Sequence, residues 1–498
     1  LVMAAPAIVL LIPSRAAIGG DAASPLEEGK ALFERRFAAG DAPALTGDGL
    51  GPVFNNVSCA ACHLQAGVGG GGPIDVNAVI LTAQLAGTRP KRDKLVEALR
   101  ELHPGFLTTD GKIVPSVLLH RFGTDLNYAG FLRGLGAPYV PEVPDRAQQD
   151  ELVYQLAQQP LPTATTAPPI RLTLSHRNTT ALFGAGLIDQ VPDSVLHAQA
   201  AAQTKQGEVS GRVPPVGIDF VGRFGWRGQT ERLHDFVLGA CANELGLEVP
   251  GIPQPRNPLQ PDYRPAGLDL TAAQCASLTS FVASLPPPKL LPPDEPAKRA
   301  VFDRGQVLFH SVGCASCHVE KIGPLDHVYS DLLLHDMGPA LADPLLAAPA
   351  LRVIKQTPLE QSDAELLLGS TQPVSSQPKL PQPQLPPPRG YYGESSSSSF
   401  ALLGEEGPAT ITVVDRKAGV KEELRAVVSP LDREWRTPPL WGLADSAPYL
   451  HDGRAATVVE AIAFHAGEAD ACTKRYFALP AGDRMAVLQF LACLQAPK

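Results

Sequence analysis

The sequence predicts a mainly α protein that consists of two related halves with long loops and insertions. Three observations predict this fold class: a five-residue motif that occurs twice, helix-like segments that recur in the same order around both copies, and a high proline content. The chain has 498 residues, of which 44% are hydrophobic and 50 are proline. This length allows several domains with sizeable cores, and so much proline favours plentiful loops and extended linkers.

The repeated motif is C-x-x-C-H. In such a motif both thiols add to the vinyl groups of one haem, and the following His is held beneath the iron as the proximal ligand. A redox-active cysteine pair or a zinc site uses similar spacing, but neither explains a His directly after both pairs. The sequence therefore predicts two covalently bound haem c groups, held by Cys59, Cys62 and His63, and by Cys314, Cys317 and His318.

The chain repeats itself around these motifs. Four pairs of segments match in the same order: 29–33 with 305–309, 179–184 with 437–442, 227–233 with 452–458, and 278–285 with 487–494. The last pair carries apolar residues at the spacing of one helical face. A helix before the motif and a helix that closes the unit are the two elements that pack behind the haem in the cytochrome c fold. We therefore expect two cytochrome c-like haem domains.

Proline-rich segments set the expected domain boundaries. Residues 286–298 form a Pro-rich linker, because proline interrupts helices and favours extended chain. The N-terminal haem domain then spans residues 23–285 and the C-terminal haem domain spans 299–498. A Pro/Ser-rich insertion at 372–399, which ends in consecutive serines, lies inside the second domain.

The first 22 residues are typical of a signal peptide. An apolar run is followed by small residues, which is the order of the core and cleavage region of a secretory signal, although a buried N-terminal helix is the alternative. The run is too short to cross a bilayer, and no stretch of about 18 apolar residues occurs elsewhere. We expect a periplasmic or otherwise exported protein with no integral membrane span in the mature chain.

The charge balance argues against one class of partner. The net charge is −9, and no block of Lys or Arg stands out. A surface that binds nucleic acid needs a basic patch. We expect no nucleic-acid partner.

Several segments resemble a known family. Residues 47–63, 177–193, 222–247, 313–318, 329–343 and 437–469 are similar to the di-haem oxidoreductases, which are described as peroxidases and sometimes labelled thiol oxidoreductases. Through APYLHDGRAAT the chain is distantly similar to bacterial di-haem cytochrome c peroxidases and to the di-haem enzyme that matures methylamine dehydrogenase. The resemblance implies that one haem reacts with peroxide or another small oxidant while the other transfers electrons. The electron donor would be a small redox protein or a quinol-linked donor, and a non-catalytic di-haem electron-transfer protein is the alternative.

The second axial ligand decides which haem does what, because two firm ligands make an electron-transfer centre and an open position permits chemistry. For the C-terminal haem we favour His465, which lies about a helix beyond the LHDG turn, where the related peroxidases place this ligand. Met337, flanked by Asp, Gly and Pro, is the alternative.

The N-terminal haem has no obvious second ligand. The Gly-rich segment 67–73 allows close backbone approach but offers no ligating atom. Each candidate is more often a structural histidine than a ligand, which is compatible with an open, reactive iron. The candidates are His103, His120, His176 and His234.

Cleavage of peroxide needs a group that moves a proton and polar donors that stabilise the departing oxygen. Arg227, Gln229 and Glu244 are suitable, and Glu244 stands where similar peroxidases carry an acid. A surface ion pair between Arg227 and Glu244 is the alternative. Tryptophans that could bridge the haems electronically, or simply pack in the core, are Trp226, Trp435 and Trp441.

Four further cysteines favour disulfides if the protein is exported. Cys241 and Cys275 occupy broadly the same places in the first half as Cys472 and Cys493 in the second. We expect one disulfide within each half, Cys241 to Cys275 and Cys472 to Cys493. Buried free thiols are the alternative.

Overall fold

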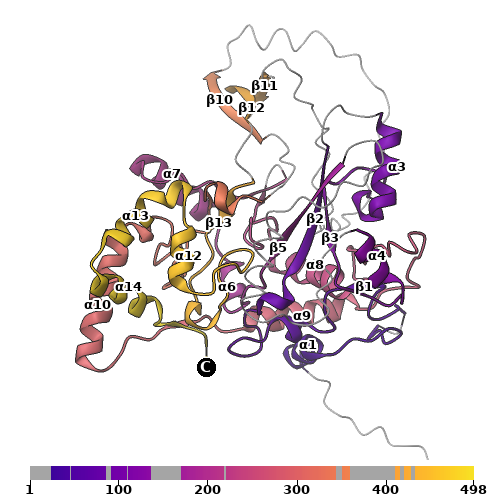
Figure 1. The fold of residues 1–498 in the computed structure, drawn as a ribbon, viewed down its shortest axis with the longest axis horizontal. Coiled ribbons are helices and arrows are strands. Elements are labelled where there is room, and N and C mark those ends of the chain that lie inside the picture. Colours follow the sequence, from indigo (N-terminus) through magenta and orange to yellow (C-terminus); the bar gives the residue numbers. More distant parts are fainter. Residues whose placement is uncertain are drawn as a thin grey trace, which may run out of the picture.

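The computed structural model describes most of the chain. The predicted signal peptide, 1–22, and the Pro/Ser-rich insertion, 372–399, lie outside the described residues. Helices are the main element, as the mainly α prediction requires, and short antiparallel sheets lie among them (Figure 1). The described residues are 24–44, 46–85, 91–108, 110–135, 170–217, 220–343, 350–358, 410–415, 420–427 and 432–497.

Each half contains an entry helix that packs against a closing helix. In the first half α1 (Pro25–Glu34) packs against α9 (Ala272–Ser284). In the second half α10 (Pro296–Ser311) packs against α14 (Ala481–Leu491). The first pair of matching segments lies in α1 and α10, and most of the last pair lies in α9 and α14, so the sequence repeat is also a repeat of structure.

A glycine lies at the contact of each helix pair. A Cβ atom on Gly29 would lie 2.0 Å from the carbonyl oxygen of Ser277, and one on Gly305 would lie 2.0 Å from that of Ala486. Real Cβ atoms do not approach a carbonyl so closely, so only glycine lets the two backbones meet. The same device therefore holds both helix pairs together.

The other described helices lie, in chain order, between the two members of each pair. α7 also reaches the second half, because the side-chain amide of Gln203 donates to the carbonyl oxygen of Ser316 at 2.9 Å. Their bounds are α2 (Cys59–Cys62), α3 (Arg92–Leu102), α4 (Tyr128–Gly134), α6 (Ala185–Ile188), α7 (Asp193–Gln206), α8 (Leu233–Leu245), α12 (Val458–Phe464) and α13 (Asp470–Ala478).

A three-stranded antiparallel sheet in the first half was not predicted. Its central strand β2 (Ala78–Leu85) pairs with β3 (Ser116–Leu119) and with β5 (Ile170–Arg177). Buried leucines of the sheet pack with Leu95 and Leu99 of α3 in one apolar cluster. The run AVIL that opens β2 is typical of a strand, but the cytochrome c expectation was for helices.

A second three-stranded sheet has the order β10 (Ala350–Pro358), β12 (Val420–Val427) and β11 (Thr410–Asp415). The Pro/Ser-rich insertion falls between β10 and β11. The remaining strands form two-stranded pairs: β1 (Val53–Phe54) with β4 (Phe122–Gly123), β6 (Pro215–Val216) with β7 (Phe220–Val221), β8 (Lys289–Leu290) with β14 (Leu494–Gln495), and β9 (Leu334–Asp336) with β13 (Glu434–Arg436).

The largest apolar cluster draws on both halves. It contains Leu196 and Leu238 of the first half together with Val328, Leu332 and Trp441 of the second half, all of them buried. The predicted linker is partly ordered into secondary structure. Its strand β8 pairs with the C-terminal strand β14, and α10 begins within the last residues of the linker. The two halves therefore share a core.

Among the residues that the structure describes, no helix is both long enough and apolar enough to cross a membrane.

Candidate functional site

The first C-x-x-C-H motif forms a single helical turn. The side chain of Ser58 caps α2, which carries Cys59 and Cys62, and His63 follows as the last residue of the turn. The Nδ1 atom of His63 lies 3.0 Å from the carbonyl oxygen of Gly70, in the Gly-rich segment. Burial lowers the pKa of His63 to about 4, so the ring is neutral. A neutral imidazole that uses Nδ1 for a carbonyl has Nε2 available for a metal.

The second motif has the same arrangement. Cys314 begins a 3-10 turn directly after α10, and His318 follows it. The Nδ1 atom of His318 lies 2.9 Å from the carbonyl oxygen of Tyr329, and burial lowers the pKa of this ring to about 4 as well. Both motif histidines are therefore neutral and oriented by a backbone carbonyl.

His465 faces His318. It ends α12, and its Nδ1 atom lies 2.6 Å from the carbonyl oxygen of Ala461. The two ring centroids are 6.5 Å apart, with an angle of 47° between the planes. Two metal–imidazole bonds of about 2 Å each, plus the distance from each ring centre to its nitrogen, nearly fill this separation. The geometry fits one metal ion between the two rings.

A cavity of about 450 Å³ surrounds these two histidines. Cys314, Cys317 and Met337 also line it, so both candidates for the second ligand border the same space. Its volume is in the range of ordinary cofactor pockets. Much of the wall is apolar, including Leu440, Leu443, Val458, Ile462 and Leu491. The residues present fit a haem in this cavity.

A smaller cavity, of about 130 Å³, borders His63. Both cysteines of the first motif line it, together with Gln229 and Glu244. The carboxylate of Glu244 accepts a hydrogen bond of 2.6 Å from Nδ2 of Asn55, and burial raises its pKa. Thiols, a neutral His and a titratable acid thus meet here, in less space than at the second motif.

None of the four candidate second ligands lines the smaller cavity, as far as its described walls show. His103 accepts a hydrogen bond from the backbone N–H of Gly105, and His120 bonds the carbonyl oxygen of Asn243. His234 bonds the hydroxyl of Thr279, and His176 lies on β5.

The two cavities share a wall. Asn178, Thr179, Gly225, Trp226 and Phe236 line both. The indole N–H of Trp226 donates to the carbonyl oxygen of Asn178 at 2.9 Å, which fixes the ring in this wall. Of the three tryptophans, Trp226 is thus the one that borders both motifs.

The other two tryptophans line only the larger cavity. Trp435 stacks on His451, with ring centroids 3.6 Å apart, and the guanidinium of Arg227 lies 4.0 Å from the centroid of the Trp435 ring. Arg227 donates to the backbone carbonyls of Asp432 and Glu434 and does not line the smaller cavity. The structure therefore brings Gln229 and Glu244 to the first motif but not Arg227, and Arg227 forms no pair with Glu244.

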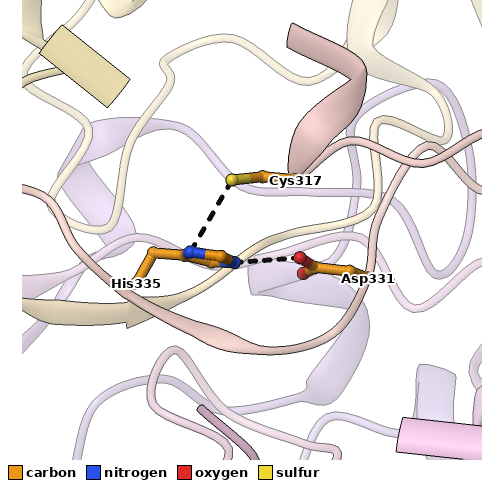
Figure 2. Close-up of side chains that lie close together, drawn as sticks. All are labelled: Cys317, Asp331 and His335. Carbon is orange, nitrogen blue, oxygen red and sulfur yellow. Dashed lines mark hydrogen bonds and ion pairs between the residues drawn. The ribbon is translucent and has the colours of Figure 1, made fainter. Parts of the chain in front are cut away.

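A buried charged cluster lies beside the second motif, and the sequence did not predict it (Figure 2). Nε2 of His335 is 2.9 Å from Asp331, Nδ1 is 2.9 Å from Glu468, and the sulfur of Cys317 is 3.7 Å from Nδ1. Burial disfavours a charged ring, but these bonds outweigh it and raise the pKa of His335 well above its ordinary value. Cys317, Asp331 and His335 lie close enough to hold a metal ion, yet Cys317 already belongs to the C-x-x-C-H motif.

The cysteines correct one prediction. All eight carry free thiols, so neither expected disulfide is formed in the structure. Cys472, on α13, places its sulfur 3.5 Å from that of Cys314, whereas the thiol of Cys493, in the turn after α14, donates to the carbonyl oxygen of Gln489 in that helix. The prediction matched Cys472 and Cys493 with Cys241 and Cys275 by their order along the chain. In the structure, α13 instead places Cys472 next to the second motif.

Comparisons with known proteins bear on this site. Residues 13–84 and 418–494 match the family model described as "Di-haem oxidoreductase, putative peroxidase". The first segment contains the first C-x-x-C-H motif and the second contains His465. A search of curated proteins gave no match. Among solved structures, hydrazine synthase of Kuenenia stuttgartiensis under xenon pressure is 17% identical, covering 64% of this chain and 73% of that chain with a TM-score of 0.28.

Proposed function

We propose that this chain, which belongs to the di-haem oxidoreductase family, is an exported enzyme with two covalent haems that acts as a peroxidase. One observation carries the proposal: among the described residues, the wall around His63 offers a part-buried acid and no second ligand, whereas His318 faces another histidine. An open haem that reacts and a closed haem that transfers electrons are the expected counterparts of these two environments.

At the second motif, Cys314 and Cys317 would form the thioether bonds, and His318 with His465 would hold the iron from both sides. His465 is a better candidate than Met337, because its ring faces that of His318 at a distance that fits one ion. Two firm axial ligands exclude substrate and favour electron transfer.

At the first motif, Cys59, Cys62 and His63 would hold the other haem, which would supply the redox-active iron for the reduction of peroxide or another small oxidant. Glu244 is the group that moves the proton between the oxidant's oxygens, since burial raises its pKa and so favours a carboxyl that can hold and release a proton. The amide of Gln229, in the same wall, would donate a hydrogen bond to the departing oxygen.

Electrons would enter from a small redox protein or a quinol-linked donor, reach the C-terminal haem, and cross the shared wall at Trp226. Covalent attachment of haem c takes place outside the cytoplasm. This requirement and the predicted signal peptide together support a periplasmic location.

One observation favours a second candidate function, a di-haem electron carrier without catalysis. The cavity at the first motif is less than a third as large as the other, which leaves little room for a substrate beside a haem. The two functions differ in ligation, because a carrier needs two six-coordinate haems and an enzyme needs one open position.

Electronic absorption and electron paramagnetic resonance spectra of the purified holoprotein test the proposal. The enzyme reading predicts one low-spin and one high-spin haem, with the high-spin signal changing when hydrogen peroxide is added and a reduced donor being oxidised. Two low-spin haems that do not respond to peroxide would instead establish the carrier.

A further inference from the structure

One buried cation in the larger cavity has no anion of its own. Arg436, on β13, is 8% exposed and lines the cavity that contains His318 and His465. Its Nε atom donates to the carbonyl oxygen of Gly225 at 3.0 Å, and its Nη1 atom is buried without a hydrogen-bond partner among the described residues. A guanidinium buried in this way is unfavourable unless an anion pairs with it.

The acids nearby are already engaged. Burial lowers the pKa of Arg436 to about 10, although the negative charge of Asp331 acts in the opposite direction. Asp331 is bonded to His335 and to Gln203. Another nearby acid, Asp343, pairs with Arg177 and Arg227 instead. The positive charge of Arg436 therefore lies at the cavity wall, and a ligand in the cavity would have to supply the anion that pairs with it.

From this geometry we infer that Arg436 binds a propionate carboxylate of the C-terminal haem. The inference rests on the proposed presence of haem at the second motif. A haem carries two carboxylates, and guanidinium pairs with carboxylate through parallel hydrogen bonds. Because Arg436 also holds the carbonyl of Gly225 and, through its backbone N–H, that of Trp226, it would tie this carboxylate to the shared wall.

The test is a spectroscopic redox titration of the holoprotein in which the two haems are resolved by spin state. Arg436→Met leaves the carboxylate uncompensated, and its negative charge favours the ferric state. We expect the ratio of reduced to oxidised C-terminal haem at a fixed ambient potential to fall on the order of tenfold, which is about 59 mV for one electron. Arg436→Lys keeps the charge and should restore most of the potential.

Arg475→Met is the matched control, since Arg475 lines the same cavity but is exposed and already donates to the carbonyl oxygen of Val312. A shift no larger than that of the control, or a shift confined to the N-terminal haem, would overturn the inference. If Arg436→Met loses haem, the potential of the C-terminal haem is compared in Arg436→Lys and Arg436→Gln. A lower potential in the Gln variant supports the inference, and equal potentials contradict it. A native protein with fewer than two haems in a pyridine haemochrome assay would contradict the proposed function itself, whereas two haems without a shift would contradict only the role of Arg436.

Discussion

The two cavities start from the same motif and differ in what faces the histidine. Both motif histidines are neutral, part-buried and held at Nδ1 by a carbonyl, and both come later in the chain than a helix that is packed through a glycine. Opposite His318 there is a second imidazole, while the walls near His63 carry a carboxyl and an amide. In the proposed function, the repeated scaffold would set where each haem is attached, and the wall that is not repeated would set what that haem does.

The largest effect is expected when covalent haem is lost from one of the two motifs. Replacing both Cys314 and Cys317 with Ala should abolish covalent haem at the second motif, because no thiol of that motif remains to add to a vinyl group. The pyridine haemochrome assay should then fall from two haems per chain to one. The matching pair of changes at Cys59 and Cys62 should leave the other haem, and an unchanged count in either variant would refute the attachment sites.

Glu244→Gln tests the chemistry of the smaller cavity. Loss of a proton-transfer group should lower the rate of peroxide reduction on the order of 10²- to 10⁴-fold, measured by donor oxidation in stopped flow. Glu231→Gln, in the same segment but outside the cavity wall, is the control. Equal rates for the two variants would remove Glu244 from the reaction.

The pH dependence follows from the direction of the Glu244 shift. Burial raises the pKa of this carboxyl, so its ionised form is lost at a higher pH than for an exposed glutamate. A rate that needs the ionised form should fall as the pH drops through this raised pKa. Glu244→Gln should remove that limb of the profile, and a limb that persists would belong to another group.

His465→Ala tests the closed character of the larger cavity. Loss of one of two axial ligands should convert the low-spin signal of the C-terminal haem to high-spin, with the N-terminal signal unchanged. Met337→Ala is the comparison, and it should leave the low-spin signal intact. The opposite pattern would make Met337 the ligand and would break the contrast between the two sites in a different way.

The smallest expected effect concerns the shared wall. Trp226→Phe should slow electron transfer between the haems while leaving both resting spectra unchanged, because Trp226 borders both cavities and its indole N–H is bonded to Asn178. Trp441→Phe, whose ring lines only the larger cavity, should have less effect. Rapid mixing of the reduced protein with peroxide would measure both, and equal rates would exclude Trp226 as the route.

The parts of the site that the sequence predicts are those in which chemistry demands contiguous residues. Haem attachment needs two thiols and a His at fixed spacing, so both motifs are visible without any structure. The helix pairs are visible because a helix in contact with a core must repeat its apolar residues. The position of His465 came from the resemblance, and the structure places its ring opposite His318.

The remaining features depend on contacts between distant residues. His335 and Asp331 are four positions apart in the sequence, but Glu468 comes from a distant segment. No local pattern indicates that these three residues meet. The sheet around β2 brings together three strands from separate segments. The disulfide prediction used order along the chain, which does not say that α13 turns Cys472 towards Cys314.

The core that crosses the midpoint of the chain has a consequence for protein engineering. Leu196 lies in one apolar cluster with Val328 and Leu332, and Gln203 of α7 donates to Asp331 at 2.7 Å. A cut in the linker would strip both halves of part of this cluster and expose apolar surface to water. The halves look like modules in sequence, but their shared core leads us to expect that neither half, excised alone, keeps the stability of the whole chain.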